Sequence, residues 1–284
     1  MKTLHKKAIS AAAVALLSGL ACSSVFAEEA AAEAPEVSPI TANVTIVNDY
    51  RYRGVSQSNL MPAIQGGFDY AHESGLYIGN WNSSISWNGD QNPGVSSPIE
   101  MDFYGGFKKE LIGEGFATDF GVLQYAYPSH GSYSYVTYSG KTQVSPNTTE
   151  LYLAQNFTFG SITGFAKFSY AVSPLFGNPN SNGSYYPDLT VNYDTGFWGL
   201  AINAHVGYQY VAGQNVVSGA PNLNYTDWKL GLTKDFGGGL SLSAAYIGTD
   251  AQKVGNNYAY MGPTNQGSKN LAGSTGIVSL TKTF

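Results

Sequence analysis

Apolar and polar residues alternate along most of the chain beyond residue 40, in stretches of about ten residues. In the clearest stretch, 196–210, one face carries Trp198, Leu200, Ile202, Ala204, Val206, Tyr208 and Tyr210. Its other face carries Gly199, Ala201, Asn203, His205, Gly207 and Gln209. Because successive side chains of a β-strand point to opposite faces, the pattern predicts strands that are apolar on one side and polar on the other.

Two further stretches show the same pattern. In 41–53 the apolar face carries Ala42, Val44, Ile46, Tyr50 and Tyr52, and the polar face carries Thr41, Asn43, Thr45, Asp49, Arg51 and Arg53. In 76–87 the apolar face carries Tyr77, Trp81, Ile85 and Trp87, opposite Asn80, Asn82, Ser84 and Ser86.

Extending this interpretation along the chain predicts twelve strands. Their expected spans are 41–53, 62–72, 76–87, 98–108, 116–127, 148–159, 162–172, 187–195, 197–210, 224–236, 239–249 and 274–284. Two are irregular. The stretch 116–127 changes its alternation near Val122, which predicts a bulge, and 148–159 mixes Tyr152 with Leu151 and Leu153.

The predicted connections alternate between short and long. Short ones fall at 73–75, 109–115, 160–161, 196 and 237–238, and long ones at 54–61, 88–97, 128–147, 173–186, 211–223 and 250–273. Outer-membrane barrels have short periplasmic turns and long external loops. The fold class expected is therefore an all-β, transmembrane, antiparallel up-and-down barrel of about twelve strands, with both ends of the barrel segment on the periplasmic side.

A soluble β-sandwich or lipocalin-like barrel is the alternative, since it would hide the apolar faces inside and show the polar faces to water. Alternation alone does not separate the two. Aromatic placement favours the membrane, because Tyr and Trp prefer the headgroup region. An outer aromatic band is expected from Tyr50, Tyr52, Trp87, Tyr208 and Tyr210, with Trp198, Trp228, Phe236 and Phe107 elsewhere on the lipid face.

The first residues have the pattern of an export signal. Lys2, Lys6 and Lys7 precede an apolar run at 8–21, and Ala27 ends a small-residue cleavage motif. We expect a cleaved signal peptide at 1–27, a flexible periplasmic leader at 28–39 and the barrel at 40–284. A lipoprotein signal at Cys22 is the alternative, but Gly19 stands where such signals carry a large aliphatic residue.

Charge and composition exclude several classes of protein. Cleavage removes three of 14 Lys+Arg and no acid, leaving 11 against 19 Asp+Glu and a formal charge of −8. A chain this acidic is not expected to bind nucleic acid. Beyond residue 27 no run of 18 apolar residues predicts a membrane-spanning helix, so a spanning fold must be a closed barrel. Without Cys22 the chain has no cysteine for a disulfide or thiolate site.

The last strand ends in an aromatic residue. Val278 and Leu280 alternate towards Phe284, the pattern of a sorting signal for the barrel-assembly machinery, although Lys282 stands where an aromatic or aliphatic residue is usual. Parity places Lys234 and Lys282 on the lipid face. Both lie near a predicted periplasmic end, where a lysine reaches water along the bilayer surface.

Several segments resemble the TorF-like putative porin family of proteobacterial outer-membrane proteins. The resemblance rests on Asn48-Asp49-Tyr50-Arg51-Tyr52-Arg53-Gly54-Val55-Ser56-Gln57-Ser58, on the stretches 62–70, 75–81 and 100–107, and on the closing 278–284. It spans nearly all of the mature chain. The resemblance implies a β-barrel with porin activity, and it implies no particular substrate, catalytic residue or ligand residue.

Inward charges are the candidate functional residues. The acidic set is Asp49, Asp69, Glu100, Asp102, Asp119, Glu150, Asp188, Asp194, Asp227 and Asp235; the basic set is Arg51, Arg53, Lys108, Lys167 and Lys229; and His205 also faces inward. Rings of charge bias which ions pass a pore, and the acidic excess predicts a weak preference for cations. Asp49, Arg51 and Arg53 beside Asp69 also fit a lateral ion-pair cluster whose role is structural.

Other chemistry is weakly represented. The Tyr-rich loop 128–147 either binds a sugar or aromatic solute at the barrel mouth or merely extends the hairpin. The mature chain keeps only His72, His130 and His205, and no hydrolase, metalloprotease or phosphate-loop motif is present. We expect no enzyme activity, cofactor or metal site.

The function expected is passive passage of small solutes or ions. The alternative is a non-conducting structural or adhesive barrel whose lumen is filled by side chains or loops, since a narrow barrel leaves little free space. Expected partners are outer-membrane lipids and lipopolysaccharide, the barrel-assembly machinery and the solutes themselves.

Overall fold

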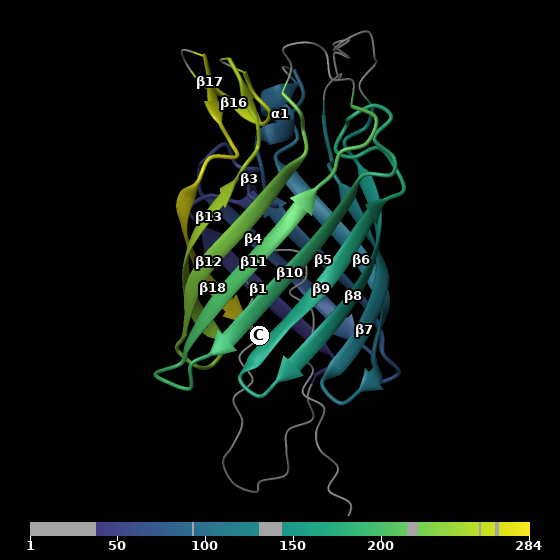
Figure 1. Cartoon of the computed structure of the whole chain (residues 1–284), viewed down its shortest axis with the longest axis vertical. Helices are drawn as coiled ribbons and strands as arrows, with labels where there is room; N and C mark the ends of the chain where they lie inside the picture. The colour runs from purple at the N-terminus through teal and green to yellow at the C-terminus, as the bar shows by residue number, and fades with distance from the viewer. Residues whose placement is uncertain (1–37, 93, 131–143, 215–220, 256, 265–266) are drawn as a thin grey trace, which may run out of the picture.

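Twelve strands pair edge to edge into one closed antiparallel barrel (Figure 1). The computed structural model describes residues 38–92, 94–130, 144–214, 221–255, 257–264 and 267–284. The barrel strands are β1 (Ile40–Val47), β4 (Ala63–Ala71), β5 (Leu76–Ser84), β6 (Ile99–Gly113), β7 (Phe116–Ala126), β8 (Thr148–Phe159), β9 (Ile162–Ala171), β10 (Tyr185–Asp194), β11 (Leu200–Gln209), β12 (Tyr225–Asp235), β13 (Leu240–Thr249) and β18 (Thr275–Thr283). Each strand pairs with its neighbours in sequence, and β1 pairs with β18 to close the ring.

The remaining elements are short and belong to the connections. They are β2 (Arg51–Tyr52), β3 (Val55–Ser56), α1 (Trp87–Gln91), β14 (Lys253–Val254), β15 (Asn257–Tyr258), β16 (Met261–Thr264) and β17 (Gly267–Asn270). Short turns join the strands at the lower end in Figure 1, and the long connections, with α1, β16 and β17, stand at the upper end. Within the described residues, no helix is long and apolar enough to span a membrane.

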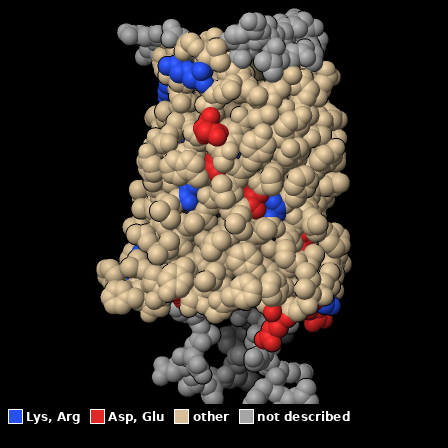
Figure 2. Space-filling view, in the orientation of Figure 1, with Lys and Arg blue, Asp and Glu red and all other residues tan. Residues whose placement is uncertain are grey.

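The outer face of the barrel is apolar around its circumference. Leu, Ile, Val and Phe side chains such as Ile78, Phe120 and Leu230 project outward and stay exposed. Figure 2 shows one side of this wall, where few charged atoms break the surface between the two rims. The predicted lysines lie at the short-turn rim. The ammonium of Lys234 donates to the carbonyl of Trp198, and that of Lys282 donates to the carbonyl of Gly238.

The prediction of twelve strands is confirmed, and most boundaries agree within three residues. Four details differ. The first strand ends at Val47 rather than at residue 53, and β5 ends at Ser84, after which Trp87 begins α1. The strand β6 runs on to Gly113. The predicted bulge near Val122 is wrong, because β7 pairs without interruption and the register shift lies between Glu110 and Gly113 of β6.

The predicted lipid-facing side of β5 is also wrong, and so is the placement of Trp87 in the aromatic band, since this residue is buried at the start of α1. Tyr77 and Trp81 point into the lumen, and the outward residues of β5 are Leu76 and Ile78. Trp198 lies in a turn just before β11 with a positive φ of 55°, where its ring is exposed at the rim. The period of two therefore predicts the strand β5 correctly, but its aromatic face points into the barrel and its aliphatic face points outward.

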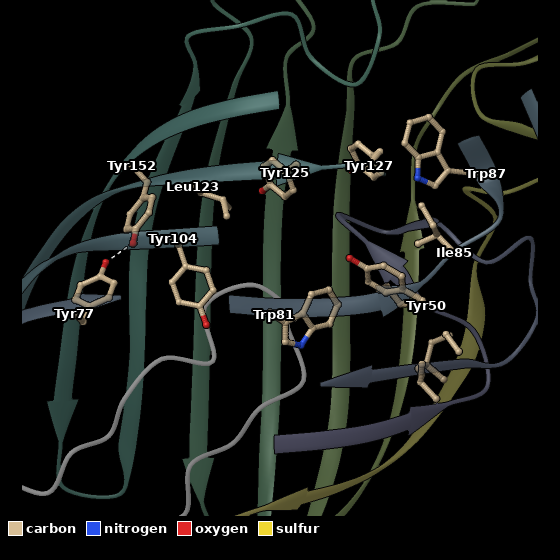
Figure 3. Close-up of a cluster of buried hydrophobic side chains, with 14 residues drawn as sticks. Tyr50, Tyr77, Trp81, Ile85, Trp87, Tyr104, Leu123, Tyr125, Tyr127 and Tyr152 are labelled. Carbon is tan, nitrogen blue, oxygen red and sulfur yellow. Dashed lines mark hydrogen bonds between the residues drawn. The ribbon is translucent and has the colours of Figure 1, made fainter. Parts of the chain in front are cut away.

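Inward tyrosines instead lie over glycines of the neighbouring strand. A β-carbon on Gly106 would lie 2.6 Å from the hydroxyl of Tyr77, and one on Gly121 would lie 2.6 Å from the hydroxyl of Tyr152. These glycines therefore leave the space in which the rings lie against the inner wall. Figure 3 shows the resulting cluster of inward aromatic side chains.

Candidate functional site

The lumen contains a segment of the chain that leaves the wall after β1. The chain bends at Asn48 and Asp49, and residues 49–58 then form a short hairpin from β2 and β3. We call residues 49–58 the lumenal hairpin. Its turn, Arg53-Gly54, has φ values of 46° and 80°, the left-handed conformation that two-residue hairpin turns of type I′ require. The base is closed by the amide of Gln57, which donates to the carbonyl of Tyr50 at 2.8 Å.

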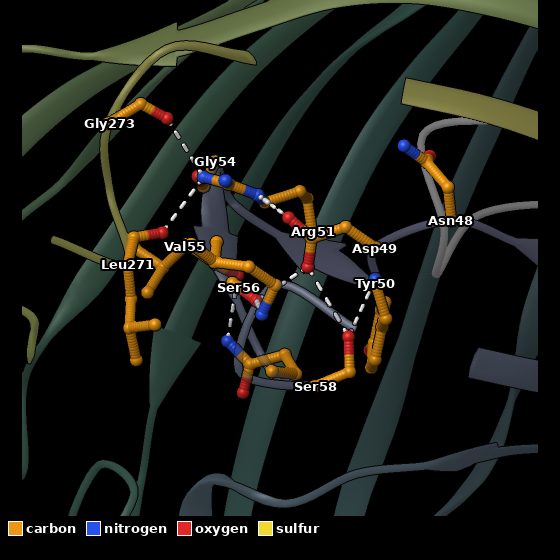
Figure 4. Close-up of polar contacts among 12 residues, drawn as sticks. Asn48, Asp49, Tyr50, Arg51, Gly54, Val55, Ser56, Ser58, Leu271 and Gly273 are labelled. Carbon is orange, nitrogen blue, oxygen red and sulfur yellow. Dashed lines mark hydrogen bonds and ion pairs between the residues drawn. The ribbon is translucent and has the colours of Figure 1, made fainter. Parts of the chain in front are cut away.

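Asp49 braces the lumenal hairpin from within (Figure 4). Its Oδ1 accepts hydrogen bonds from the hydroxyls of Ser56 at 2.5 Å and Ser58 at 3.3 Å. Its Oδ2 accepts from Nε of Arg51 at 2.6 Å. Since Asp49 is buried, this set of partners replaces the water that a carboxylate needs.

Arg51 ties the lumenal hairpin to the last long loop. Its Nη1 donates to the carbonyls of Gly54 at 2.9 Å, Leu271 at 2.8 Å and Gly273 at 3.0 Å (Figure 4). Because the Arg51 guanidinium donates to a carboxylate and to backbone carbonyls of two segments, its role is to hold the lumenal hairpin against the loop.

Arg53, at the tip of the lumenal hairpin, reaches the opposite wall. Its guanidinium donates to both carboxylate oxygens of Glu150 on β8, at 3.0 and 2.7 Å, and to Oε1 of Gln209 on β11 at 2.7 Å. It also lies 4.1 Å from the centre of the Tyr186 ring on β10. In the strand order, β8 and β10 are each five strands away from β1. The hairpin therefore spans the lumen and is held at its far side by a charged bond.

Tyrosines of the lumenal hairpin contact the β5–β8 side of the wall. Tyr50 donates to Oε1 of Glu100 at 2.6 Å, and Tyr127 donates to Oε2 of the same carboxylate at 2.6 Å. The hydroxyls of Tyr52 and Tyr125 lie 2.5 Å apart. The prediction of Tyr50 and Tyr52 on the lipid face is thus wrong, since Tyr50 is only 2% exposed.

A cavity lies beside the tip of the lumenal hairpin, against β9 to β13. Its volume is about 90 Å³. Its polar lining includes Lys167, Asp188, Thr190, His205, Asp227 and Lys229. Since a water molecule takes up roughly 30 Å³ in the liquid, this space holds on the order of three waters or a solute of a few heavy atoms.

The far wall of the cavity carries a hydrogen-bonded group around His205. Its Nε2 lies 3.0 Å from Oδ2 of Asp227, and its Nδ1 lies 2.9 Å from Oγ1 of Thr190. Tyr186 donates to Oδ1 of Asp227 at 2.7 Å. The arrangement orders the polar groups that face the cavity.

Other predicted site residues lie away from this cavity. Asp69 accepts a hydrogen bond from Tyr104, so the expected cluster of Asp69 with Asp49, Arg51 and Arg53 does not form as one unit. Only Asp49 and Arg51 form an ion pair with each other.

Towards the short-turn rim, Lys108 and Asp119 face each other in the register of β6 and β7, and Asp119 accepts from Tyr77 at 2.7 Å. Asp194 and Asp235 lie at the rim itself, where their carboxylates accept from the amides of Gly196 at 2.9 Å and Gly237 at 2.7 Å. These two residues cap turns instead of lining the interior.

Asp102 is fully buried in the lumen wall, and its Oδ1 has no hydrogen-bond partner among the described residues. Glu150 has the opposite situation, because Arg53 and Tyr125 both donate to it. Sequence reasoning placed both side chains inside the barrel, and the structure agrees.

The three histidines beyond the expected signal peptide lie far from one another. His72 is in a turn at the short-turn end, His130 forms an isolated bridge with Ser96 among the long loops, and only His205 is in the lumen. Among the described residues, no group of three or more His, Cys, Asp or Glu side chains is placed to hold a metal ion. Residues 131–143 of the Tyr-rich loop lie outside the described part of the chain.

Sequence reasoning missed the lumenal hairpin and the inward aromatics. No local signal marked the hairpin, because residues 48–53 continue the alternation of the preceding strand. For β5 the signal was the opposite face, since Leu76 and Ile78 are aliphatic and suit hydrocarbon better than tyrosine does.

Comparisons with solved structures return porins. The NanC porin aligns with a TM-score of 0.51 at 9% identity, over 86% of this chain and 98% of NanC. The KdgM porin aligns with a TM-score of 0.48 at 6% identity, and its complex with disordered oligogalacturonate with 0.49 at 6%; each alignment covers 86% of this chain and 98% of KdgM. At such identities the likeness to NanC shows the fold alone.

Sequence comparison gives a family and no activity. No curated protein matches the chain. The TorF-like name of the resemblance is not confirmed by the description of the family that does match. The model of that family, described as "Bacterial protein of unknown function (Gcw_chp)", covers residues 29–284, and the chain therefore belongs to the Gcw_chp family.

Proposed function

We propose that the protein is a porin-like channel of the outer membrane, through which small solutes or ions pass passively. The outer face supports this placement, because the exposed aliphatic and aromatic side chains around the barrel match the hydrocarbon of a bilayer. The inner face supports passage, because charged side chains such as Lys167, Asp188 and Asp227 stand along it.

The observation that carries the proposal is the contact of Arg53 with Glu150. It places the lumenal hairpin across the barrel, where it narrows the path to the space beside its tip. The protein would then be a constricted channel for solutes of few heavy atoms, with the hairpin as its size-limiting element.

A weak preference for cations follows from the excess of carboxylates over basic groups on the lumen wall. Glu100 and Asp102 on β6 have no basic residue opposite them on β5 or β7. A reversal potential measured across a salt gradient tests this, and anion selectivity would contradict it.

A non-conducting barrel is the second candidate. The burial of the lumen carboxylates favours it, since Asp119 is 0% exposed and Glu150 is 1% exposed. In that case the hairpin and the inward aromatics would fill the barrel, and its role would be structural or adhesive.

Planar-bilayer recording of the refolded full barrel separates the two candidates. Stepwise currents support the channel. A barrel that migrates as folded in unheated gel samples but gives no current supports the non-conducting alternative.

Export and assembly complete the proposal. We infer that residues 1–27 are a cleaved signal peptide and 28–39 a periplasmic leader, which lie almost wholly outside the described residues. The barrel would meet lipopolysaccharide and phospholipid on its apolar wall, after insertion by the barrel-assembly machinery.

A further inference from the structure

Two oppositely charged side chains that face the cavity are not bonded to each other. Lys167 on β9 and Asp188 on β10 stand directly opposite each other in the strand register. Such residues have β-carbons about 4.5–5.5 Å apart. The ammonium of Lys167 nevertheless leans towards β8, where it lies 4.6 Å from the centre of the Tyr152 ring.

Asp188 is left with an unused oxygen. Its side chain is 8% exposed, and its Oδ1 has no hydrogen-bond partner among the described residues, with Nδ1 of His205 3.9 Å away. A buried carboxylate oxygen without a donor costs free energy. Lys167 and Asp188 both line the cavity, and neither charge is used in an ion pair with the other, so an ammonium and a carboxylate are available at the same space.

The positive and negative side chains that line the cavity are equal in number once the ion pairs of the two arginines are set aside. Arg51 and Arg53 line it, but they are paired with Asp49 and Glu150. A ligand with net charge would disturb this balance in a poorly hydrated space.

The other charged lining residues are Lys167 and Lys229 against Asp188 and Asp227. Two positive and two negative groups favour a ligand that is itself neutral overall but carries both signs.

We propose that this cavity is a binding site for a small zwitterion, an α-amino acid of few carbon atoms. The ligand's carboxylate accepts from the ammonium of Lys167, and its ammonium donates to the carboxylate of Asp188. The tyrosine rings beside the site bound the space left for the ligand's own side chain. This site rests on the proposed channel function, because an amino acid reaches the cavity only through the lumen.

Saturation-transfer NMR on the refolded full barrel in detergent micelles tests the site without any current. L-Alanine is the zwitterionic probe, and propionate and ethylammonium each carry one of its two charges. We expect saturation of alanine signals, with propionate and ethylammonium about tenfold weaker or more, as loss of one charged hydrogen bond implies. Equal signals from all three, or none from alanine, would overturn the proposal.

Matched variants on one strand locate the site. Asp188→Asn should weaken alanine binding about tenfold. Asp194→Asn, on the same face of β10 but at the rim, should leave it unchanged. Equal effects of the two would place binding elsewhere. A barrel that binds alanine but never conducts would contradict the proposed channel and leave the binding site standing. A barrel that conducts but does not bind alanine would contradict the binding site and leave the channel standing.

Discussion

The guanidinium of Arg53 meets the carboxylate of Glu150 in a two-pronged bond of 2.7 and 3.0 Å, although the two residues lie 97 positions apart and on distant sides of the barrel. Both side chains are almost fully buried. A charged pair in this setting fixes the position of the lumenal hairpin, because separation would leave both charges without partners.

Removing this bond should loosen the lumenal hairpin. We expect Arg53→Ala to raise single-channel conductance or the frequency of open steps, since loss of one partner from a buried ion pair costs about 3–5 kcal/mol. Planar-bilayer recording provides the measurement. Glu150→Gln should act in the same direction, and the double variant should differ little from Arg53→Ala, because the two changes remove one interaction. Fully additive effects would contradict this.

The hydrogen bonds to Asp49 should limit the motion of the lumenal hairpin. Asp49→Asn weakens the bonds from Ser56, Ser58 and Arg51, and hydrogen bonds to charged groups contribute about 1.5–3 kcal/mol each. The expected result is larger current fluctuation at constant voltage. Asp235→Asn at the rim is the control and should record like the unaltered barrel; identical traces from the Asp49 variant would contradict the assigned brace.

The apolar wall should penalise charge according to depth. Leu230 lies midway along β12 and is 60% exposed, whereas Leu240 begins β13 at the short-turn end. We expect Leu230→Arg to cost about 2–4 kcal/mol and Leu240→Arg about 0–1 kcal/mol. Denaturant unfolding of the barrel in lipid vesicles measures both. Equal costs at the two positions would argue against a bilayer around this wall.

Phe284 should matter more for assembly than for the finished barrel. Its backbone amide and carbonyl bond to Ala42, and its side chain is 71% exposed. Phe284→Ala keeps the backbone bonds, so refolding in detergent should be nearly unchanged. The fraction of heat-modifiable barrel in cell outer membranes should fall. Normal assembly in cells would show that the ring carries no sorting information.

The strand pattern could be predicted because a period of two is strong wherever lipid meets one face. Which face meets the lipid is less certain from sequence. Tyrosine suits both a membrane boundary and a polar interior, and Tyr77 and Trp81 lie inside while Leu76 lies outside. Glycines such as Gly106, which make room for inward rings, act between strands and are not visible within one strand.

The lumenal hairpin could not be predicted for a different reason. Residues 48–53 continue the alternation of β1, so the local pattern gives no sign that the chain leaves the wall. The bond that holds the tip joins Arg53 to Glu150, and a contact between distant segments has no local signature. The inward position of most barrel charges was predictable, except for Asp194 and Asp235, which cap turns at the rim, but the partners of the inward charges were not predictable.

Single-channel conductance of a hairpin-shortened barrel tests the central claim most directly. Because the amide of Gln57 already bonds to the carbonyl of Tyr50, residues 51–56 can be replaced by Gly-Gly without moving the ends. If the hairpin is the constriction of a porin-like channel, the shortened barrel conducts severalfold more than the unaltered one. A folded, shortened barrel with unchanged conductance, or with none, would contradict the account.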